Sequence, residues 1–264
     1  MKSDFEMIIQ TFPERENITI LPIGDVHLGA VEHMGDAWER FCKTVLETPN
    51  TYITLGGDLI DNGTRNGVTN IFKATMPPSA QKRKMAEHLK PLAREGRILC
   101  AVSGNHERRS GKDADDDPMY DIMSKLDLED IYRENMAFLK ICMGEQNGCG
   151  MQNPTYCLGV THGAGGGIYT GAAVNRNERF GYTIDGIDAL IVGHTHKGAM
   201  TKPQKIVVDK HNNKISYKPF AVVSSVSWLR FGGYALQKML LPAENGDPQS
   251  LILHGTQKKI KLTW

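Results

Sequence analysis

Short apolar runs, each closed by glycine or a polar residue, alternate with amphipathic segments in the first half of the chain. The runs cover residues 18–23, 52–55 and 97–102, and their aliphatic and β-branched side chains are typical of buried strands. Between them, residues 38–46 place apolar side chains at helical spacing. Residues 79–94 form a second, basic helical segment that Pro91 should kink or divide. Alternating strands and helices predict a largely parallel sheet in this half.

The second half of the chain predicts strands with few helices between them. Residues 119–132 have the pattern of one or two helices. Later apolar runs predict strands at residues 138–143, 156–160, 206–208, 214–226, 234–241 and 251–262. Residues 61–77 and 108–117 are polar and predict loops. Because no linker or repeat interrupts the pattern, we expect one domain of α/β class over residues 1–264, with a mostly antiparallel second half.

Composition and charge set only broad limits on the partners of the protein. Hydrophobic residues make up 40% of the chain and the formal net charge is +1, so bulk charge predicts neither a nucleic-acid coat protein nor a membrane-surface protein. The five cysteines show no CxxC spacing, which favours free thiols in a reducing compartment. Because no stretch resembles a signal peptide or could span a bilayer, we expect a cytoplasmic protein without membrane contact.

Five short polar groups follow apolar, strand-like runs. They are Asp25-Val26-His27, Gly57-Asp58-Leu59-Ile60-Asp61, Gly104-Asn105-His106-Glu107, Thr161-His162-Gly163 and Gly193-His194-Thr195-His196. Side chains two residues apart on extended backbone point to the same side, so we expect His194 and His196 to face the same way. Ligands collect at the carboxyl ends of the strands in parallel sheets. Imidazoles, carboxylates and one amide at that edge predict a site for metal ions.

Taken in order, these groups resemble the signature of the calcineurin-like metallophosphoesterase superfamily, which reads DxH, GDxxD, GNH, a lone histidine beside glycine, and GHxH. The resemblance covers residues 25–196, about two thirds of the chain, with no group missing. It implies a four-layer αββα sandwich with two mixed β-sheets flanked by helices. It also implies a metal-dependent phosphoesterase.

The resemblance further implies two divalent metal ions with a set of ligands for each. The first ion would be held by Asp25, His27 and His196, the second by Asn105, His162 and His194, and Asp58 would bridge the two. Mixed nitrogen and oxygen ligands suit manganese, iron or zinc, and of these we expect Mn²⁺. A hydroxide between the two ions would attack phosphorus, and the ions would stabilise the attacking and leaving oxygens.

His106 and Asp61 complete the catalytic site that the resemblance implies. It makes His106 a general acid near the leaving oxygen, a role worth roughly 10²–10⁴ in rate. Asp61 takes the place of the aspartate that orients this histidine in the Ser/Thr phosphoprotein phosphatases of the superfamily. We therefore expect the Asp61 side chain to hold the His106 ring.

Two departures from the phosphatase pattern bear on the substrate. Those phosphatases carry arginines that grip a phosphomonoester dianion at the positions of Asn62 and Ser103. The DNA nuclease branch of the superfamily has a histidine in place of Asp61 and a separate capping domain, but its opening resembles residues 25–29 followed by Trp38. We favour a phosphodiester substrate, either nucleic acid or nucleotide, over the alternative of a phosphomonoesterase or protein phosphatase.

Four further points stay open at the level of sequence. A non-catalytic scaffold with this fold is an alternative, and it would bind no metal. The glycine-rich stretch at residues 163–167 is either a loop close to the metals or a plain turn after a strand. Arg108 and Arg109, which follow His106, are candidates for a phosphate contact. The sequence does not set an oligomeric state.

Overall fold

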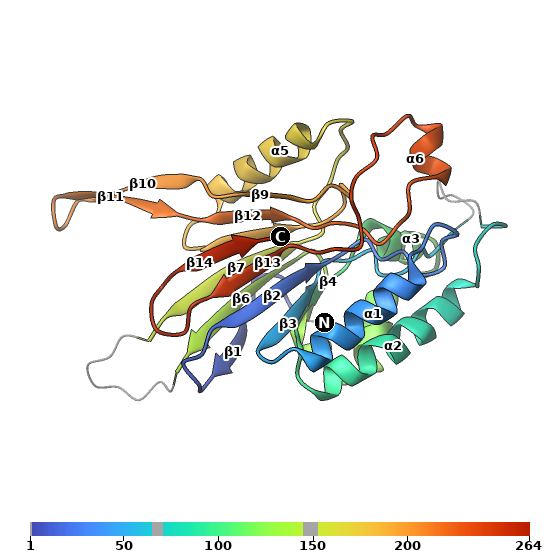
Figure 1. Ribbon diagram of the computed structural model, residues 1–264, viewed down its shortest axis with the longest axis horizontal. Coiled ribbons are helices and arrows are strands. Elements are labelled where there is room, and N and C mark those ends of the chain that lie inside the picture. Colours follow the sequence, from blue (N-terminus) through green and yellow to red (C-terminus); the bar gives the residue numbers. More distant parts are fainter. Residues whose placement is uncertain (1, 65–70, 145–152) are drawn as a thin grey trace.

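Two mixed β-sheets face each other at the centre of the molecule, with helices on their outer faces (Figure 1). The computed structural model describes residues 2–64, 71–144 and 153–264. One cluster of buried side chains lies between the sheets, and two others lie between a sheet and the helices that cover it. The described part of the chain therefore has four layers, which confirms the predicted αββα sandwich of α/β class.

The first sheet has the spatial order β14-β13-β2-β3-β4-β5. Its strands are β2 (Ile18–Ile23), β3 (Thr51–Leu55), β4 (Ile98–Val102), β5 (Tyr132–Arg133), β13 (Ser250–Leu253) and β14 (Ile260–Thr263). Strands β2 to β5 run parallel, while β13 and β14 form an antiparallel edge beside β2. The three apolar runs predicted in the first half are thus neighbouring strands, and their carboxyl ends meet at one edge.

The second sheet has the spatial order β1-β6-β7-β8-β12-β9. Its strands are β1 (Ile8–Phe12), β6 (Met136–Met143), β7 (Thr155–Thr161), β8 (Ala189–Val192), β9 (Ala199–Thr201) and β12 (Ala221–Ser224). Strand β6 pairs antiparallel with β7, and β9 with β12. Strands β7, β8 and β12 run parallel, so the prediction of a mostly antiparallel second half is wrong at the centre of this sheet.

The helices of the described residues lie outside the two sheets, and four of them cover the outer faces of the sheets. They are α1 (Gly35–Glu47), α2 (Pro78–Arg94), α3 (Asn105–Ala114), α4 (Pro118–Ser124), α5 (Thr170–Thr183) and α6 (Gly233–Gln237), with a 3-10 turn at Glu129–Ile131. Helices α1, α2 and α4 pack on the first sheet, where Trp38, Val45 and Leu89 are fully buried. Helix α5 packs on the second sheet, and Gly181 lets its backbone approach the ring of Phe220.

The helices predicted in the first half are confirmed with one correction. Helix α2 continues through Pro91, which lies in its last turn. The lost N–H and the clash of the proline ring with the carbonyl of Glu87 therefore affect only this last turn, and the helix is not divided. The region 119–132 forms α4 and the 3-10 turn, in agreement with the expectation of one or two helices.

The charged stretch 108–117, predicted as a loop, lies largely in helix α3. This helix has no apolar face to reveal it in the sequence. Its first turn is held instead by side chains: the His106 backbone N–H donates to Asp58 Oδ1 (2.7 Å), and the Gly104 N–H donates to the Glu107 carboxylate (2.9 Å). Contacts with the neighbouring loop therefore set where α3 begins.

The second half departs from the sequence-based expectations at three further places. Residues 234–241 form the short helix α6 and a following coil, in which Leu236 and Met239 are exposed, so the apolar run does not mark a buried strand. Helix α5 was not predicted, because Gly171 and Gly181 interrupt its pattern. The run 214–226 is divided into β11 (Lys214–Pro219) and β12.

Strand β11 pairs with β10 (Gln204–Asp209) in a two-stranded antiparallel ribbon that belongs to neither large sheet. The ribbon extends beyond the body of the molecule, at the upper left of Figure 1. Strands were predicted at both of its positions, but its separation from the sheets was not.

Membrane contact and disulfides were both expected to be absent. Among residues 2–64, 71–144 and 153–264, no helix is long and apolar enough to cross a membrane. Cys42, Cys100, Cys142 and Cys157 are free thiols, in agreement with the prediction, and Cys149 lies outside the described residues.

Candidate metal centre

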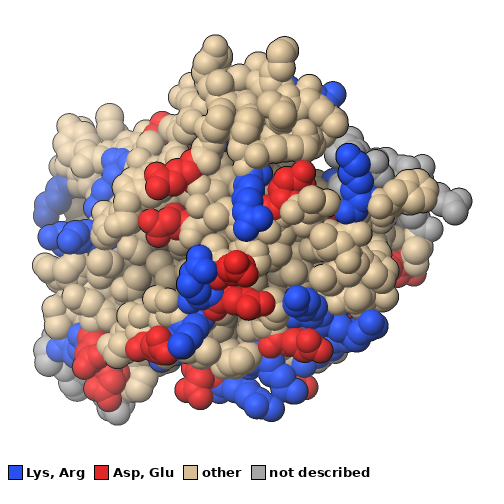
Figure 2. Space-filling view, turned by 45° about the vertical axis from the view of Figure 1, so that its right-hand side comes forward, with Lys and Arg blue, Asp and Glu red and all other residues tan. Residues whose placement is uncertain are grey.

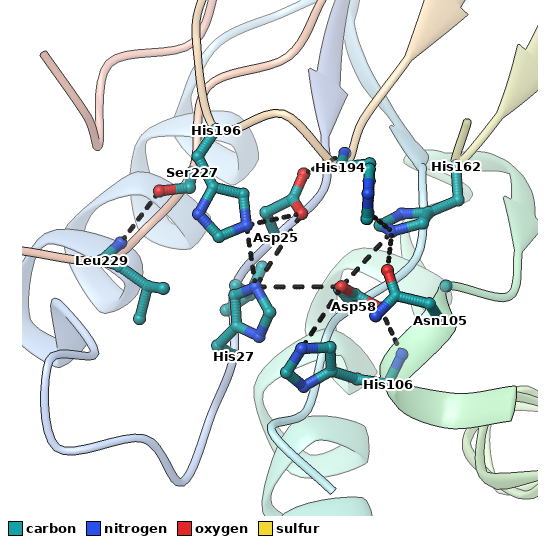
Figure 3. A network of polar contacts seen from close by, with 12 residues as sticks. Asp25, His27, Asp58, Asn105, His106, His162, His194, His196, Ser227 and Leu229 are labelled. Atoms are coloured by element: carbon teal, nitrogen blue, oxygen red, sulfur yellow. Dashed lines mark hydrogen bonds and ion pairs between the residues drawn. The ribbon is translucent and has the colours of Figure 1, made fainter. Parts of the chain in front are cut away.

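The five polar groups of the sequence meet where the strands of both sheets end (Figure 3). Asp25 and His27 follow β2, Asp58 follows β3, and Asn105 begins α3 after β4. His162 follows β7 and His194 follows β8 in the second sheet. Because all these strands present their carboxyl ends to the same side, loops far apart in the chain converge on one site.

The backbone of these loops is not extended. Asp25, His27, Asp58, His194 and His196 all have positive φ angles, between 48° and 72°. Positive φ is sterically costly for non-glycine residues, although aspartate and histidine are enriched there, and such residues cluster at functional sites. The expectation that His194 and His196 lie on extended backbone and face the same way is therefore wrong.

His194 and His196 instead contact different parts of the site. The His194 ring lies beside His162, with His194 Nδ1 3.2 Å from His162 Nε2. The His196 ring lies beside Asp25 and His27 (Figure 3). Because of the left-handed backbone, His194 and His196 join two different groups of side chains.

The first group consists of Asp25, His27 and His196. His196 Nε2 lies 3.0 Å from Asp25 Oδ1 and 3.2 Å from His27 Nε2. His27 Nε2 lies 3.8 Å from Asp25 Oδ1. Asp25 and His27 are buried, whereas the His196 side chain is 36% exposed, so this group is reached from the His196 side.

The second group consists of Asp58, His162 and His194, with Asn105 beside them. His162 Nε2 lies 3.3 Å from Asp58 Oδ2 and 3.0 Å from Asn105 Oδ1. Asp58 Oδ2 is also 3.9 Å from His27 Nε2 of the first group. Asp58 therefore lies between the two groups.

Each aspartate has one oxygen held by a backbone amide and one directed into the site. The His194 N–H donates to Asp25 Oδ2 (2.8 Å), and the His106 N–H donates to Asp58 Oδ1 (2.7 Å). Asp25 Oδ1 is buried and accepts no hydrogen bond, although the His196 ring is close to it. An orphaned carboxylate oxygen beside imidazole nitrogens fits a divalent cation, whose charge would compensate the burial.

The His162 ring is held in one orientation. Its Nδ1 lies 2.8 Å from the carbonyl oxygen of Gly56, which can only accept, so Nδ1 carries a proton. Nε2 is thereby directed toward Asp58 and His194. A backbone carbonyl that fixes the tautomer in this way is the usual support for a metal-ligating histidine.

The electrostatics of the site keep both carboxylates ionised. Burial alone would raise the pKa of Asp25, but His196 and His27 beside it lower that pKa below its usual range. Burial acts on Asp58 in the same direction, and His106 and His162 hold its pKa well below the ordinary value. Burial and the charge of His106 lower the pKa of His27 to about 4, so its ring is neutral at pH 7 and can bind a cation.

His162 behaves differently from His27. Burial acts to lower its pKa, but the charge of Asp58 outweighs burial and raises the pKa of His162 to about 9. The metal-free site therefore holds a proton on this ring at pH 7. A cation that binds Nε2 must displace it.

His106 lies beside Asp58 and contacts Asp61 mainly through the backbone. His106 Nδ1 is 2.7 Å from the Asp61 carbonyl oxygen and 3.4 Å from Asp61 Oδ1. The predicted pairing is therefore present, but the shorter contact comes from the main chain. Since the carbonyl only accepts, Nδ1 carries a proton and Nε2 faces the site, 3.8 Å from Asp58 Oδ2.

Glu107 is a residue to which sequence reasoning gave no role. Its carboxylate is fully buried and accepts hydrogen bonds from the backbone N–H groups of Asp58 (2.8 Å), Leu59 (2.7 Å), Ile60 (3.2 Å) and Gly104 (2.9 Å). It thus fastens the loop after β3 to the loop after β4. A glutamate three residues past Gly104, where a helix begins after β4, has the spacing of a capping box and is the signal that could have found it.

The residues at the positions of the phosphatase arginines are buried. The Asn62 side-chain amide donates to the carbonyl of His106 and to Ser110 Oγ, both at 2.7 Å, and so supports α3. Ser103 is 1% exposed. Neither position presents a cation to the site.

The glycine-rich stretch 163–167 is anchored at several points. Arg176 of α5 donates to the carbonyls of Ala164 and Gly166, and the ammonium group of Lys197, next to His196, donates to the carbonyl of Gly167 (2.9 Å). These contacts connect the stretch to His196 and α5. They favour the interpretation of a loop that borders the site over that of a plain turn.

Comparisons with known proteins give the family of the chain. Residues 18–198 match the family model of the calcineurin-like phosphoesterases, a range that includes every group described above. No curated protein matches the chain.

Three solved structures have low similarity to the chain. A conserved uncharacterized protein from Streptococcus pneumoniae, described as a predicted phosphoesterase, is 10% identical, with a TM-score of 0.37 over 94% of this chain and 97% of that one. The calcineurin-like phosphoesterase YfkN from Bacillus subtilis is 12% identical, with a TM-score of 0.39 over 90% of this chain and 85% of that one. A metallophosphoesterase from Sphaerobacter thermophilus is 15% identical, with a TM-score of 0.39 over 89% of this chain and 83% of that one.

The family assignment rests on the family model, because the structural similarities are low. The matched range covers more than half of the chain, from β2 to just beyond His196. The family implies divalent metal ions, and the described residues contain Asp and His groups that could bind them. The chain therefore belongs to the calcineurin-like phosphoesterase family and is a metal-dependent hydrolase of phosphate esters.

Proposed function

We propose that the protein hydrolyses phosphodiesters, of nucleic acid or nucleotide, with two Mn²⁺ ions bound at the convergent strand ends. The observation that carries the diester proposal is the burial of Asn62 and Ser103. A phosphomonoester dianion needs a cationic fork at these positions, whereas a diester carries one charge less. The donor set of six imidazoles or carboxylates with an amide suits Mn²⁺, and iron or zinc would also fit it.

In this proposal Asp25, His27 and His196 hold the first ion. Asn105, His162 and His194 hold the second, and Asp58 lies between the two ions. When bound, the ions supply a nucleophile at neutral pH and stabilise the charge on the phosphoryl oxygens. The left-handed loops and the amides that fix each aspartate preorganise these side chains.

His106 is the proposed general acid. The Asp61 carbonyl keeps one proton on Nδ1, so the imidazolium form carries its second proton on Nε2, on the side of the site. Burial and the charge of Arg109 act to lower the pKa of His106, but Asp58 and Asp61 raise it above its ordinary value. In the metal-free protein this raised pKa favours the protonated ring, which is the form that a general acid needs.

Recognition of the substrate would be local to the site. On the face seen in Figure 2, lysine and arginine side chains are interspersed with acidic ones and form no continuous basic surface. Arg109 is near enough to His106 for its charge to affect that ring, so we propose that it contacts the substrate phosphate. One guanidinium group suits a singly charged diester.

A phosphomonoesterase remains the second candidate, favoured by the contact between His106 and Asp61. The experiment that separates the two compares hydrolysis of bis-p-nitrophenyl phosphate and p-nitrophenyl phosphate by metal-stripped protein, with and without Mn²⁺. We expect Mn²⁺-dependent preference for the diester. Preference for the monoester would overturn the diester proposal but keep the phosphoesterase, and lack of Mn²⁺ activation would overturn the proposed metal.

A further inference from the structure

The β10–β11 ribbon lies at the opposite end of the second sheet from the metal centre. It leads into Ala221, the first residue of β12, whereas the other end of β12, Ser224, pairs with Val192, just before His194. Figure 1 shows the ribbon projecting from the body of the molecule, away from α3 and α6. The proposed phosphodiesterase activity therefore gives this ribbon no role.

The register of the ribbon separates its side chains into two unlike faces. Gln204 pairs with Pro219, Ile206 with Tyr217 and Val208 with Ile215. Because strand side chains alternate, these residues share one face, and it carries no charge. The other face contains Lys205, Val207, Asp209, Lys214, Ser216 and Lys218. We call the first set, residues 204, 206, 208, 215, 217 and 219, the uncharged face.

The uncharged face is open to solvent. Its four large apolar side chains, Ile206, Val208, Ile215 and Tyr217, are 67–71% exposed. A two-stranded ribbon alone is marginally stable in water, and a contiguous exposed apolar patch marks an interaction site. The ribbon thus has the pattern of a half-buried sheet without the layer that would bury it.

We propose that the uncharged face is an interface between two copies of this chain. All the strand charges lie on the other face, so two ribbons packed through their uncharged faces bring no like charges together. A phosphate backbone or an acidic partner would find no cation on the uncharged face. A second copy supplies the same apolar pairs, as an isologous two-fold interface requires.

The exposed area is sufficient for a dimer of moderate affinity. Four side chains with these exposures present roughly 500 Å² per copy, so a face-to-face pair would bury on the order of 1,000 Å², the lower bound for a specific interface. The free energy gained by burying such an area is only slightly larger than the entropic cost of association. We therefore expect a dissociation constant on the order of 10 µM.

Sedimentation velocity of the full chain over roughly 1 to 200 µM tests this proposal, since that range brackets the expected constant. The wild-type mass should rise from 29.3 kDa toward twice that value. Val208→Asp places a charge in the interface and should weaken the dimer at least tenfold. Ile215→Asp, its cross-strand partner, should do the same.

Val207→Asp is the matched control, because Val207 is adjacent in sequence but lies on the opposite face. It should keep the wild-type dissociation constant. Phosphate-ester hydrolysis by each variant reports whether the body of the protein is folded. A wild-type chain that stays monomeric throughout the range would overturn the proposal. So would a dimer that Val208→Asp leaves intact or that Val207→Asp disrupts equally.

Discussion

The Glu107 carboxylate accepts a hydrogen bond from the backbone N–H of Asp58 at 2.8 Å and another from that of Gly104 at 2.9 Å. The residue beside the proposed general acid therefore fixes the loop that presents the aspartate between the two groups of ligands. His106 completes the connection, because its own N–H donates to Asp58 Oδ1. The loops after β3 and β4 behave as one unit held by side chain-to-backbone contacts.

Glu107→Ala should destabilise the protein and weaken metal binding. The change leaves four buried N–H groups without an acceptor, and each such group costs about 1–3 kcal/mol. Urea unfolding of the metal-free protein should show a loss of at least about 3 kcal/mol in the free energy of unfolding. Glu87→Ala, on the exposed face of α2, is the control and should change little. Equal stability of the two variants would show that the Glu107 contacts contribute nothing.

His106→Ala should lower kcat by roughly 10²–10⁴ and leave the bound metal in place. Asp61→Asn should cost less, about tenfold, because the shorter contact to His106 Nδ1 comes from the Asp61 carbonyl, which the substitution keeps. Steady-state kinetics together with metal analysis of each variant checks both expectations. Full activity of metal-loaded His106→Ala would remove His106 from the chemistry.

Arg109→Ala should raise the KM for a diester roughly tenfold with a smaller change in kcat, because a charge-assisted contact with the substrate is lost. Arg108→Ala is the matched control. Its guanidinium donates to Asn135 Oδ1 at 3.3 Å, away from His106, so its KM should stay near that of the wild type. An equal rise in KM for the two variants would show that the loss of positive charge, and not a contact made by Arg109, weakens substrate binding.

Metal affinity should rise with pH between 7 and 9. In the metal-free protein Asp58 raises the pKa of His162 to about 9 against the effect of burial, so the ring carries a proton that a metal ion must displace. The association constant for the metal ion should increase by up to about tenfold per pH unit and level off above pH 9. Calorimetric titration with Mn²⁺ in buffers of different ionisation enthalpy measures the protons released. If Mn²⁺ binding released no protons at pH 7, the claim that His162 is protonated in the metal-free protein would be wrong.

The same raised pKa affects the stability of the metal-free protein. A group whose pKa rises on folding stabilises the native state fully below its ordinary pKa, here 6.5, and that contribution is lost as the pH rises through about 9. Metal-free protein should therefore unfold at lower urea concentration at pH 9.5 than at pH 7.5, a range above the ordinary histidine pKa in which the neutral ring of His27 contributes almost no change. The metal-loaded protein should not show this loss, since the ion replaces the proton.

The sequence predicted the parts of the fold that repeat a simple pattern. Strands β2, β3 and β4 have continuous apolar runs, and α1 has Trp38 and Val45 at helical spacing, so periodicity identifies them. The five motifs identified the site because each of them follows a predicted strand. Their positions after predicted strands were enough to place Asp58 and His162 at the strand ends where the site lies.

Periodicity failed where tertiary contacts decide the local structure. Helix α3 carries Arg108 and Arg109 in place of an apolar face and depends on contacts with Asp58 and Glu107. The positive φ angles of His194 and His196 are imposed by the contacts of the loop, such as the bond from the His194 N–H to Asp25. Neither the conformation nor the separation of the two rings is encoded in the spacing of the histidines.

The central claim of this account is a pair of metal ions with Asp58 between them. Isothermal titration of metal-stripped protein with Mn²⁺, supported by elemental analysis, measures the number of ions per chain directly. We predict two ions per chain for the wild type, loss of one with His196→Ala, loss of the other with His194→Ala, and weakening of both with Asp58→Ala. A wild-type protein that binds a single ion, or none, at saturating Mn²⁺ would contradict the claim.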